Sequence, residues 1–188
     1  MTVKRRPGGR TARTKSSVFE AVTVLVTERG YGAFNMTEVA ERAGVAVTSL
    51  YRRWGDVRVL IMEVAVERLL QEYPLPDTGA LARDLRTWAR SIAAGLSSPE
   101  GSSFFQAFIA TALPTGSNGA ARMAALKPRV AQLETMLDRA RARSEPSPSI
   151  EDVVDMLLAP LYTRTLFGMP TDEALADRLV KRLLGECR

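Results

Sequence analysis

The chain has 188 residues and a formal net charge of +5, with 26 lysines and arginines against 21 aspartates and glutamates. It has no histidine, which removes the commonest general base and metal ligand, and it shows no phosphate-binding glycine loop or Gly-x-Ser-x-Gly motif. We therefore predict that it is not an enzyme and needs neither a metal nor another cofactor. The chain has a single cysteine, Cys187, and it has neither a signal-peptide core nor an apolar stretch long enough to span a membrane. These features predict a cytoplasmic protein without membrane segments.

The positive charge is concentrated in the first part of the chain. Residues 1–55 hold ten basic side chains and four acidic ones, so the rest of the chain is slightly negative. We predict that residues 1–10 form a flexible arm that follows DNA phosphates or enters a narrow minor groove. The basic residues of this arm are Lys4, Arg5, Arg6 and Arg10. A solvated tail is the alternative; a membrane-bound arm is less favoured, because only Val3 would enter lipid.

Two short helices around a glycine are predicted between residues 35 and 54. Asn35 is a good N-cap, and Glu38 three positions later completes a capping box at the start of the first helix. Gly44 suits the left-handed backbone that ends this helix and turns the chain. The second helix is expected from about Val47 to Arg53. Such corners also occur in helical proteins that never bind DNA, and here the surrounding basic charge favours DNA binding.

The second of these helices is predicted to read DNA. Leu50 and Trp54 should face inward, which leaves small polar, aromatic and arginine side chains on the outer side, as suits an element in the major groove. Val47 suits a thymine methyl group, and the hydroxyl and arginine side chains suit base edges and phosphates. The residues that we expect to contact DNA are Thr37, Val47, Thr48, Ser49, Tyr51, Arg52, Arg53 and Arg58.

Apolar positions at helical spacing continue to the end of the chain, and no run of alternating β-branched residues indicates a strand. The predicted fold class is therefore all-α. A turn-rich segment, residues 73–79, ends one helix and marks a domain boundary, so that residues 11–72 form a first domain and residues 73–188 a larger second domain. Helices are expected over residues 56–72, 81–96, 104–109, 123–137, 150–167 and 172–186. Pro128 should kink the fourth of these or restart it, and Pro160 should bend the fifth.

Residues 11–72 resemble the DNA-binding domain of the TetR family of bacterial transcriptional regulators. The resemblance rests on Gly30-Tyr31, on Val39 to Val45 and on Leu50-Tyr51-Arg52, with an aromatic residue at Trp54. It implies an N-terminal three-helix, helix-turn-helix domain and a larger C-terminal helical domain that binds a small molecule and dimerises. It also implies that the residues matching Val47, Thr48, Ser49, Tyr51 and Arg52 face DNA.

The chain departs from the family pattern at two positions. Ala46 stands where a small hydroxylated residue usually caps the reading helix, a loss worth about 0.5–2 kcal/mol. Val57 stands where a lysine commonly grips a phosphate at the start of the fourth helix. Arg58 is adjacent and is the candidate to replace that lysine, although it points in a different direction around the helix.

The resemblance also implies an effector pocket among the middle helices and a dimer formed by the last two helices. Aromatic and methionine side chains are the candidates to line a pocket for a neutral or hydrophobic effector, with ordinary core as the alternative for each: Trp88, Phe105, Phe108, Met123, Met156 and Tyr162. The candidates for the homodimer interface are Leu157, Leu161, Leu175, Leu179 and Leu183, with ordinary core as the alternative for most of these apolar positions. A single short reading helix covers too little DNA for specific binding. This also favours a homodimer that binds a palindromic double-stranded operator.

The sequence therefore predicts a ligand-released transcriptional repressor. The hypothesis is that the effector changes the separation of the two reading helices, which must match successive major grooves about 34–36 Å apart. A helical adaptor that binds another protein through its C-terminal helices is the alternative, and its DNA affinity would not depend on Tyr51 or Arg52.

Overall fold

The computed structural model describes residues 9–112 and 119–185, with side chains for residues 12–111 and 124–185. The described residues form helices and no strands, as predicted. The helices are α1 (Gly9–Arg29), α2 (Met36–Ala43), α3 (Val47–Trp54), α4 (Val57–Glu72), α5 (Leu81–Ser97), α6 (Pro99–Ala112), α7 (Gly119–Ala142), α8 (Ile150–Val153), the π-helical turn η1 (Val154–Leu158), α9 (Ala159–Leu166) and α10 (Glu173–Leu183). None of the described helices has the length and apolar character needed to cross a membrane.

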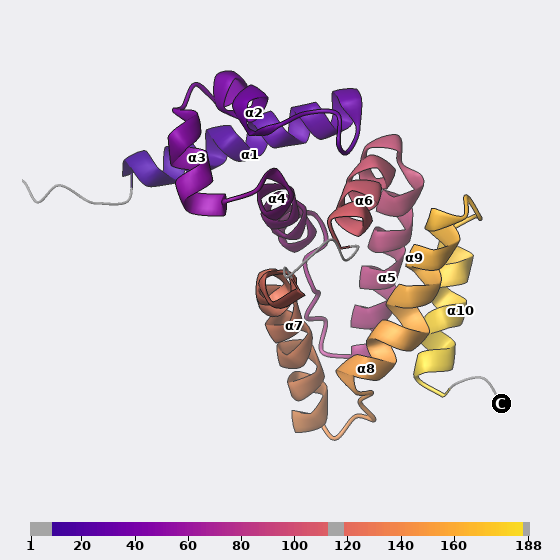
Figure 1. Ribbon diagram of the computed structural model, residues 1–188. Coiled ribbons are helices and arrows are strands. Elements are labelled where there is room, and N and C mark those ends of the chain that lie inside the picture. The colour runs from indigo at the N-terminus through magenta and orange to yellow at the C-terminus, as the bar shows by residue number, and fades with distance from the viewer. Residues whose placement is uncertain (1–8, 113–118, 186–188) are drawn as a thin grey trace, which may run out of the picture.

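The first three helices form a small module at one end of the molecule (Figure 1). Its core is built from apolar positions of α1, α2, α3 and α4, among them Val22, Leu25, Val39, Leu50 and Leu60, all of which are buried. Helix α1 begins at Gly9, so two of the ten residues that we assigned to the arm belong to a helix. The other arm residues, including Lys4, Arg5 and Arg6, lie outside the described part of the chain, as does the side chain of Arg10.

The larger module is organised around α5, which packs against α10 and contacts α6, α7 and α9. Trp88, Leu85 and Ile92 give α5 a continuous buried side. Helix α10 covers this side on the outer flank, with α9 next to it (Figure 1). The second hydrophobic core therefore lies between α5, α7, α9 and α10 and shares no buried residue with the core of the first module.

Pro160 changes the helix that contains it in a specific way. Proline lacks an N–H group, and its ring collides with the carbonyl four residues earlier in a regular α-helix. The chain widens into η1 immediately before it, where the Ala159 N–H donates to the Val154 carbonyl five residues back. The predicted bend is thus a π-helical turn. By contrast, α7 runs through Pro128 without restarting.

Helix α6 connects the two modules. It begins at Pro99, directly after α5, and is longer than the short helix expected from the sequence. Its consecutive residues Phe104 and Phe105 belong to different cores: Phe104 packs in the core of the first module and Phe105 in that of the second. Helix α6 also contacts both α1 and α4. The first module therefore rests on a helix that also belongs to the larger module (Figure 1).

Candidate DNA-binding surface and effector cavity

The corner between α2 and α3 has the local structure that its sequence indicates. The Asn35 side chain accepts hydrogen bonds from the Thr37 and Glu38 N–H groups at 2.9 and 3.2 Å, and the Glu38 carboxylate accepts one from the Asn35 N–H at 2.9 Å. Gly44 ends α2 in the left-handed region, at φ 65°. The Val45 N–H then reaches back to the Ala40 carbonyl at 3.0 Å, which closes a Schellman-type cap and sets the direction of α3.

Helix α3 presents one face to solvent and buries the other. Leu50 and Trp54 are buried, and the Trp54 Nε1–H donates to Glu63 on α4 at 2.7 Å, which fixes α3 against α4. Tyr51 is 52% exposed, far more than an aromatic residue with only a packing role. The other predicted contacts with exposed side chains are Thr37, Thr48, Arg52 and Arg53, whereas Val47 and Ser49 are half-buried.

The arginines near this surface differ in their partners. Arg42 is held by two hydrogen bonds to Glu28, at 2.7 and 3.0 Å, and this contact lowers the pKa of the Glu28 carboxyl group. Arg29 is paired with Glu38 at 2.7 Å. Arg53 lies over the Trp54 ring at 4.8 Å. Arg52 has no acidic partner among the described residues, so its charge is available to a phosphate or a base edge.

Arg58 is held by its own helix cap. Asp56 caps α4 by accepting from the Arg58 N–H at 2.7 Å, and the Arg58 guanidinium donates to both Asp56 oxygens at 3.2 and 3.1 Å. This contact lowers the pKa of Asp56 and raises that of Arg58. Because a carboxylate already balances its charge, Arg58 is a weaker phosphate ligand than an unpaired lysine at the same end of the helix.

Helix α3 lacks a side-chain N-cap, and this leads to a prediction about the stability of the protein. Ala46 has the extended backbone of an N-cap residue but provides no side-chain hydrogen bond to the helix. An Ala46→Ser variant should therefore satisfy one free N–H group and stabilise the protein by about 0.5–2 kcal/mol. Thermal unfolding without DNA measures this gain. As a control, Asn35→Ala removes an existing cap and should lower the melting temperature. A lower melting temperature for Ala46→Ser would contradict the assignment of Ala46 as an N-cap position.

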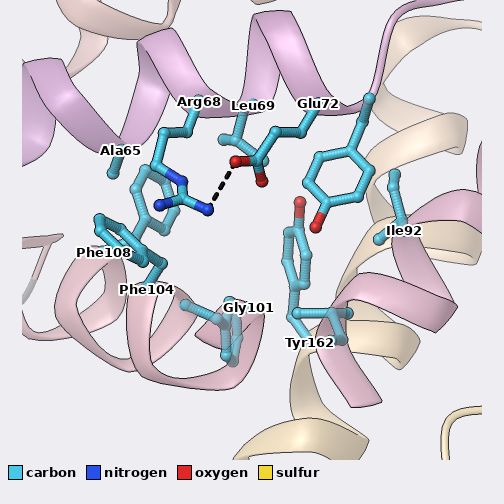
Figure 2. Close-up of a pocket in the computed structure, with 12 residues that line it drawn as sticks. Ala65, Arg68, Leu69, Glu72, Ile92, Gly101, Phe104, Phe108 and Tyr162 are labelled. Atoms are coloured by element: carbon cyan, nitrogen blue, oxygen red, sulfur yellow. Dashed lines mark ion pairs between the residues drawn. The ribbon is translucent and has the colours of Figure 1, made fainter. Parts of the chain in front are cut away.

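A cavity lies where α4, α5, α6 and α9 meet (Figure 2). The space between its side chains, with the open mouth included, is about 500 Å³. Most of the lining is apolar, and the polar exceptions are an Arg68–Glu72 ion pair and two tyrosine hydroxyl groups. The lining residues are Ala65, Arg68, Leu69, Glu72, Tyr73, Ile92, Leu96, Gly101, Phe104, Phe105, Phe108 and Tyr162.

The cavity includes half of the residues predicted for an effector pocket. Phe105, Phe108 and Tyr162 line it, and the Phe105 and Tyr162 rings are 5.0 Å apart. Trp88 instead lies in the core of the larger module, and Met156 points to solvent, since η1 turns it away from the interior. The side chain of Met123 lies outside the described residues. The contribution of α4 was not predicted, because the spacing of Arg68 and Glu72 is that of an ordinary surface ion pair.

The leucines predicted for the dimer interface are in the core of the protomer itself. Leu157 and Leu161 are completely buried, and those of α10 pack towards α5: Leu175, Leu179 and Leu183. The helical pattern identified an apolar side, and of its two interpretations the burial within the protomer favours core over dimer interface. The exposed apolar residues of this region lie on η1, on α9 and on the corner after α9, and they are Val154, Met156, Leu166, Phe167 and Met169.

Comparison with known families agrees with this architecture. Residues 18–64 match the family model described as bacterial regulatory proteins, tetR family. Residues 75–183 match the one described as tetracyclin repressor-like, C-terminal domain. The chain is 30% identical over 179 residues to the HTH-type transcriptional regulator AqdR of Rhodococcus erythropolis, covering 93% of this chain and 86% of AqdR. It is 27% identical over 173 residues to YdeS of Bacillus subtilis (strain 168), which is named as an uncharacterized HTH-type transcriptional regulator, covering 91% of this chain and 86% of YdeS.

Solved structures show the same fold over nearly the whole chain. The TetR family transcription regulator SCO0332 superposes with a TM-score of 0.79 at 25% identity, over 94% of this chain and 99% of that one. A TetR transcriptional regulator from Rhodococcus sp. RHA1 has a TM-score of 0.70 at 23% identity, over 96% and 100% of the two chains. With both of its domains matched, the chain belongs to the TetR family of bacterial regulatory proteins and is a helix-turn-helix transcriptional regulator.

Proposed function

We propose that this regulator acts as a homodimer that represses transcription from a palindromic operator and is released when a small molecule occupies the cavity of Figure 2. The observation that carries the DNA assignment is the solvent face of α3, where Thr48, Tyr51 and Arg52 are exposed together. Of these, Arg52 is the strongest candidate for a base or phosphate contact, because its guanidinium has no acidic partner among the described residues. The opposite face of α3, through Leu50 and Trp54, anchors the helix in the core of the first module.

Exposed apolar residues on η1, on α9 and directly after α9 support the dimer. Val154, Met156, Leu166, Phe167 and Met169 form a set of large exposed apolar side chains within one part of the larger module. Large apolar patches of this kind mark interaction surfaces in soluble proteins. The outward residues of α10 are mostly charged, for example Arg178, Lys181 and Arg182. We therefore centre the twofold interface on η1, α9 and the corner that follows α9.

The route from the cavity to DNA passes through α4 and α6. Arg68 of α4 pairs with Glu100 of α6 at 2.9 Å and lies 4.0 Å above the Phe104 ring. Both Arg68 and Phe104 line the cavity, and Phe104 also packs in the core that holds α3. A ligand that separates α6 from α4 would therefore move the base on which the reading helix rests. This supplies a physical path for the change in reading-helix separation.

The test is binding of the purified protein to the DNA upstream of its own gene and to a random duplex of equal length. We expect tighter binding to the upstream DNA, by a dimer, with an affinity for both duplexes that falls steeply as salt rises. Fluorescence anisotropy at two salt concentrations measures both properties. Equal and weak binding to both duplexes, repeated on a genomic fragment library, would contradict sequence-specific recognition.

A further inference from the structure

The larger module buries an arginine without a counterion. Arg129 of α7 is 7% exposed, and no carboxylate pairs with it among the described residues. Its guanidinium donates to the Tyr73 carbonyl oxygen at 2.8 Å and to the Gln132 side-chain oxygen at 3.0 Å, and its central carbon lies 5.1 Å from the centre of the Trp88 ring. Burial lowers the pKa of Arg129, since the charged form loses hydration. A buried charge of this kind normally has an opposite charge beside it.

Arg139 shows that the structural task of Arg129 does not require an unpaired charge. Arg139 lies on the same helix and also donates to the connection between α4 and α5, in this case to the Pro76 carbonyl oxygen at 3.3 Å. It has an acidic partner, Asp77, at 3.2 Å. The two arginines thus hold the same connection to α7, and only one of them has a carboxylate.

Trp88 and two tyrosines of the same module carry further hydrogen-bond donors without partners among the described residues. The buried Trp88 Nε1–H has no acceptor in the structure. The Tyr73 and Tyr162 rings line the cavity, and neither hydroxyl group has a hydrogen-bond partner among the described residues. Burial raises the pKa of Tyr162 to about 12, so this hydroxyl keeps its proton and can donate it. Figure 2 shows the Tyr162 ring extending across the cavity towards α4.

The α4 side of the same cavity has the opposite electrostatic character. Arg68 is shared between Glu72 and Glu100, so two carboxylates accompany one guanidinium there. A negatively charged ligand group is therefore disfavoured beside Glu72 and favoured beside Tyr73 and Tyr162, the lining residues that interact with the buried Arg129. Most of the remaining lining is apolar, with Phe104, Phe105 and Phe108 from α6.

We infer that the effector is an organic anion. Its single negative group binds beside Tyr73 and Tyr162 and pairs with Arg129, which is buried outside the cavity lining, and its apolar body lies among the phenylalanines of α6. This inference rests on the proposed effector role of the cavity and differs from the neutral or hydrophobic effector that the sequence alone predicts. The negative group supplies the counterion that Arg129 lacks and the acceptor that the tyrosine hydroxyl groups lack.

The test uses pairs of probes that differ only in charge: 2-naphthoate and 2-naphthamide, indole-3-acetate and indole-3-acetamide, and decanoate and decanamide. Titration calorimetry on the full-length protein should show that at least one carboxylate binds ten or more times tighter than its amide. If every amide binds as tightly as its carboxylate, or if no probe binds, the inference is overturned.

Two substitutions locate the site. Arg129→Gln should remove the preference for the carboxylate, whereas Arg139→Gln, the matched control on the same helix, should keep it. If circular dichroism shows that Arg129→Gln does not fold, Tyr162→Phe decides the question. This variant loses only a hydroxyl group and should bind the carboxylate about tenfold more weakly, with little change for the amide. A carboxylate preference unchanged by Tyr162→Phe and by any folded Arg129 variant would overturn the assignment of this site.

Operator release is measured separately, so that the two proposals can fail independently. A carboxylate that binds with the expected preference but leaves the protein on its operator would contradict the effector role and preserve the anion site. Release of the operator by the amides as readily as by the carboxylates would contradict the anion site and preserve the effector role.

Discussion

Replacing Arg52 with alanine is expected to weaken operator binding by about 1–3 kcal/mol, and to leave the fold and the dimer unchanged. The side chain is exposed on α3 and has no acidic partner among the described residues. Its substitution therefore removes a full positive charge from the proposed interface without breaking an internal ion pair. Anisotropy titrations with the operator and a random duplex distinguish its role: a phosphate contact lowers both affinities, and a base contact mainly lowers the operator affinity.

Arg42→Ala is the matched control for this experiment. Arg42 is also an exposed arginine of the helix-turn-helix, on α2, but its guanidinium is occupied by Glu28 at 2.7 and 3.0 Å. We expect its substitution to change operator affinity by less than about twofold, since exposed ion pairs of this kind contribute little. Equal losses for the two variants would mean that operator affinity follows total charge and not the α3 surface.

The reading corner was predictable because its signals are local. Asn35 and Glu38 cap a helix through contacts three residues apart, and Gly44 ends it by adopting a positive φ. Each of these effects is decided within a few residues, whatever the rest of the chain does. The outward direction of Tyr51 and Arg52 then follows from helical spacing once Leu50 and Trp54 are placed inside.

The packing of the last helices was harder to predict from the sequence, because periodicity identifies an apolar side but not the neighbour that covers it. The spacing of a regular helix would put Ile150, Val154 and Leu157 on one side. The π-helical turn η1 changes the spacing, so that Val153, Leu157 and Leu161 are buried while Val154 is exposed. The turn itself results from Pro160, whose effect on the preceding carbonyls depends on how the surrounding helices allow the chain to widen.

The polar part of the cavity depends on contacts between distant segments. The Arg68–Glu72 spacing is that of a solvent-exposed helical ion pair, and only the approach of Glu100, 32 residues away, places Arg68 over Phe104. Tyr73 lies in the predicted domain break, where nothing in the sequence indicates that its ring packs against Gly95. In the structure a β-carbon at Gly95 would lie 1.9 Å from the Tyr73 hydroxyl oxygen, so the glycine is what admits the ring.

Replacing Phe167 with aspartate is expected to dissociate the dimer and, as a result, to abolish tight operator binding. Phe167 is 73% exposed in the protomer, the most exposed large apolar side chain among the described residues. An aromatic anchor of a protein interface is worth about 2–4 kcal/mol, and in a twofold dimer each substitution acts twice. The variant should therefore be a monomer in light scattering at concentrations where the unchanged protein is a dimer.

The fold of this variant should remain intact, because an exposed side chain gives little to the core of its own protomer. Ala131→Asp is the control: it adds the same charge at an exposed position on α7, which lies across the larger module from α9 in Figure 1, and should leave the dimer unchanged. The monomer keeps a complete reading helix but contacts one half-site at a time, so it loses the gain from linking two half-sites. A monomeric Phe167→Asp variant with full operator affinity would show that DNA recognition does not need the dimer. A dimeric variant would place the interface elsewhere, with the charged face of α10 as the next surface to test.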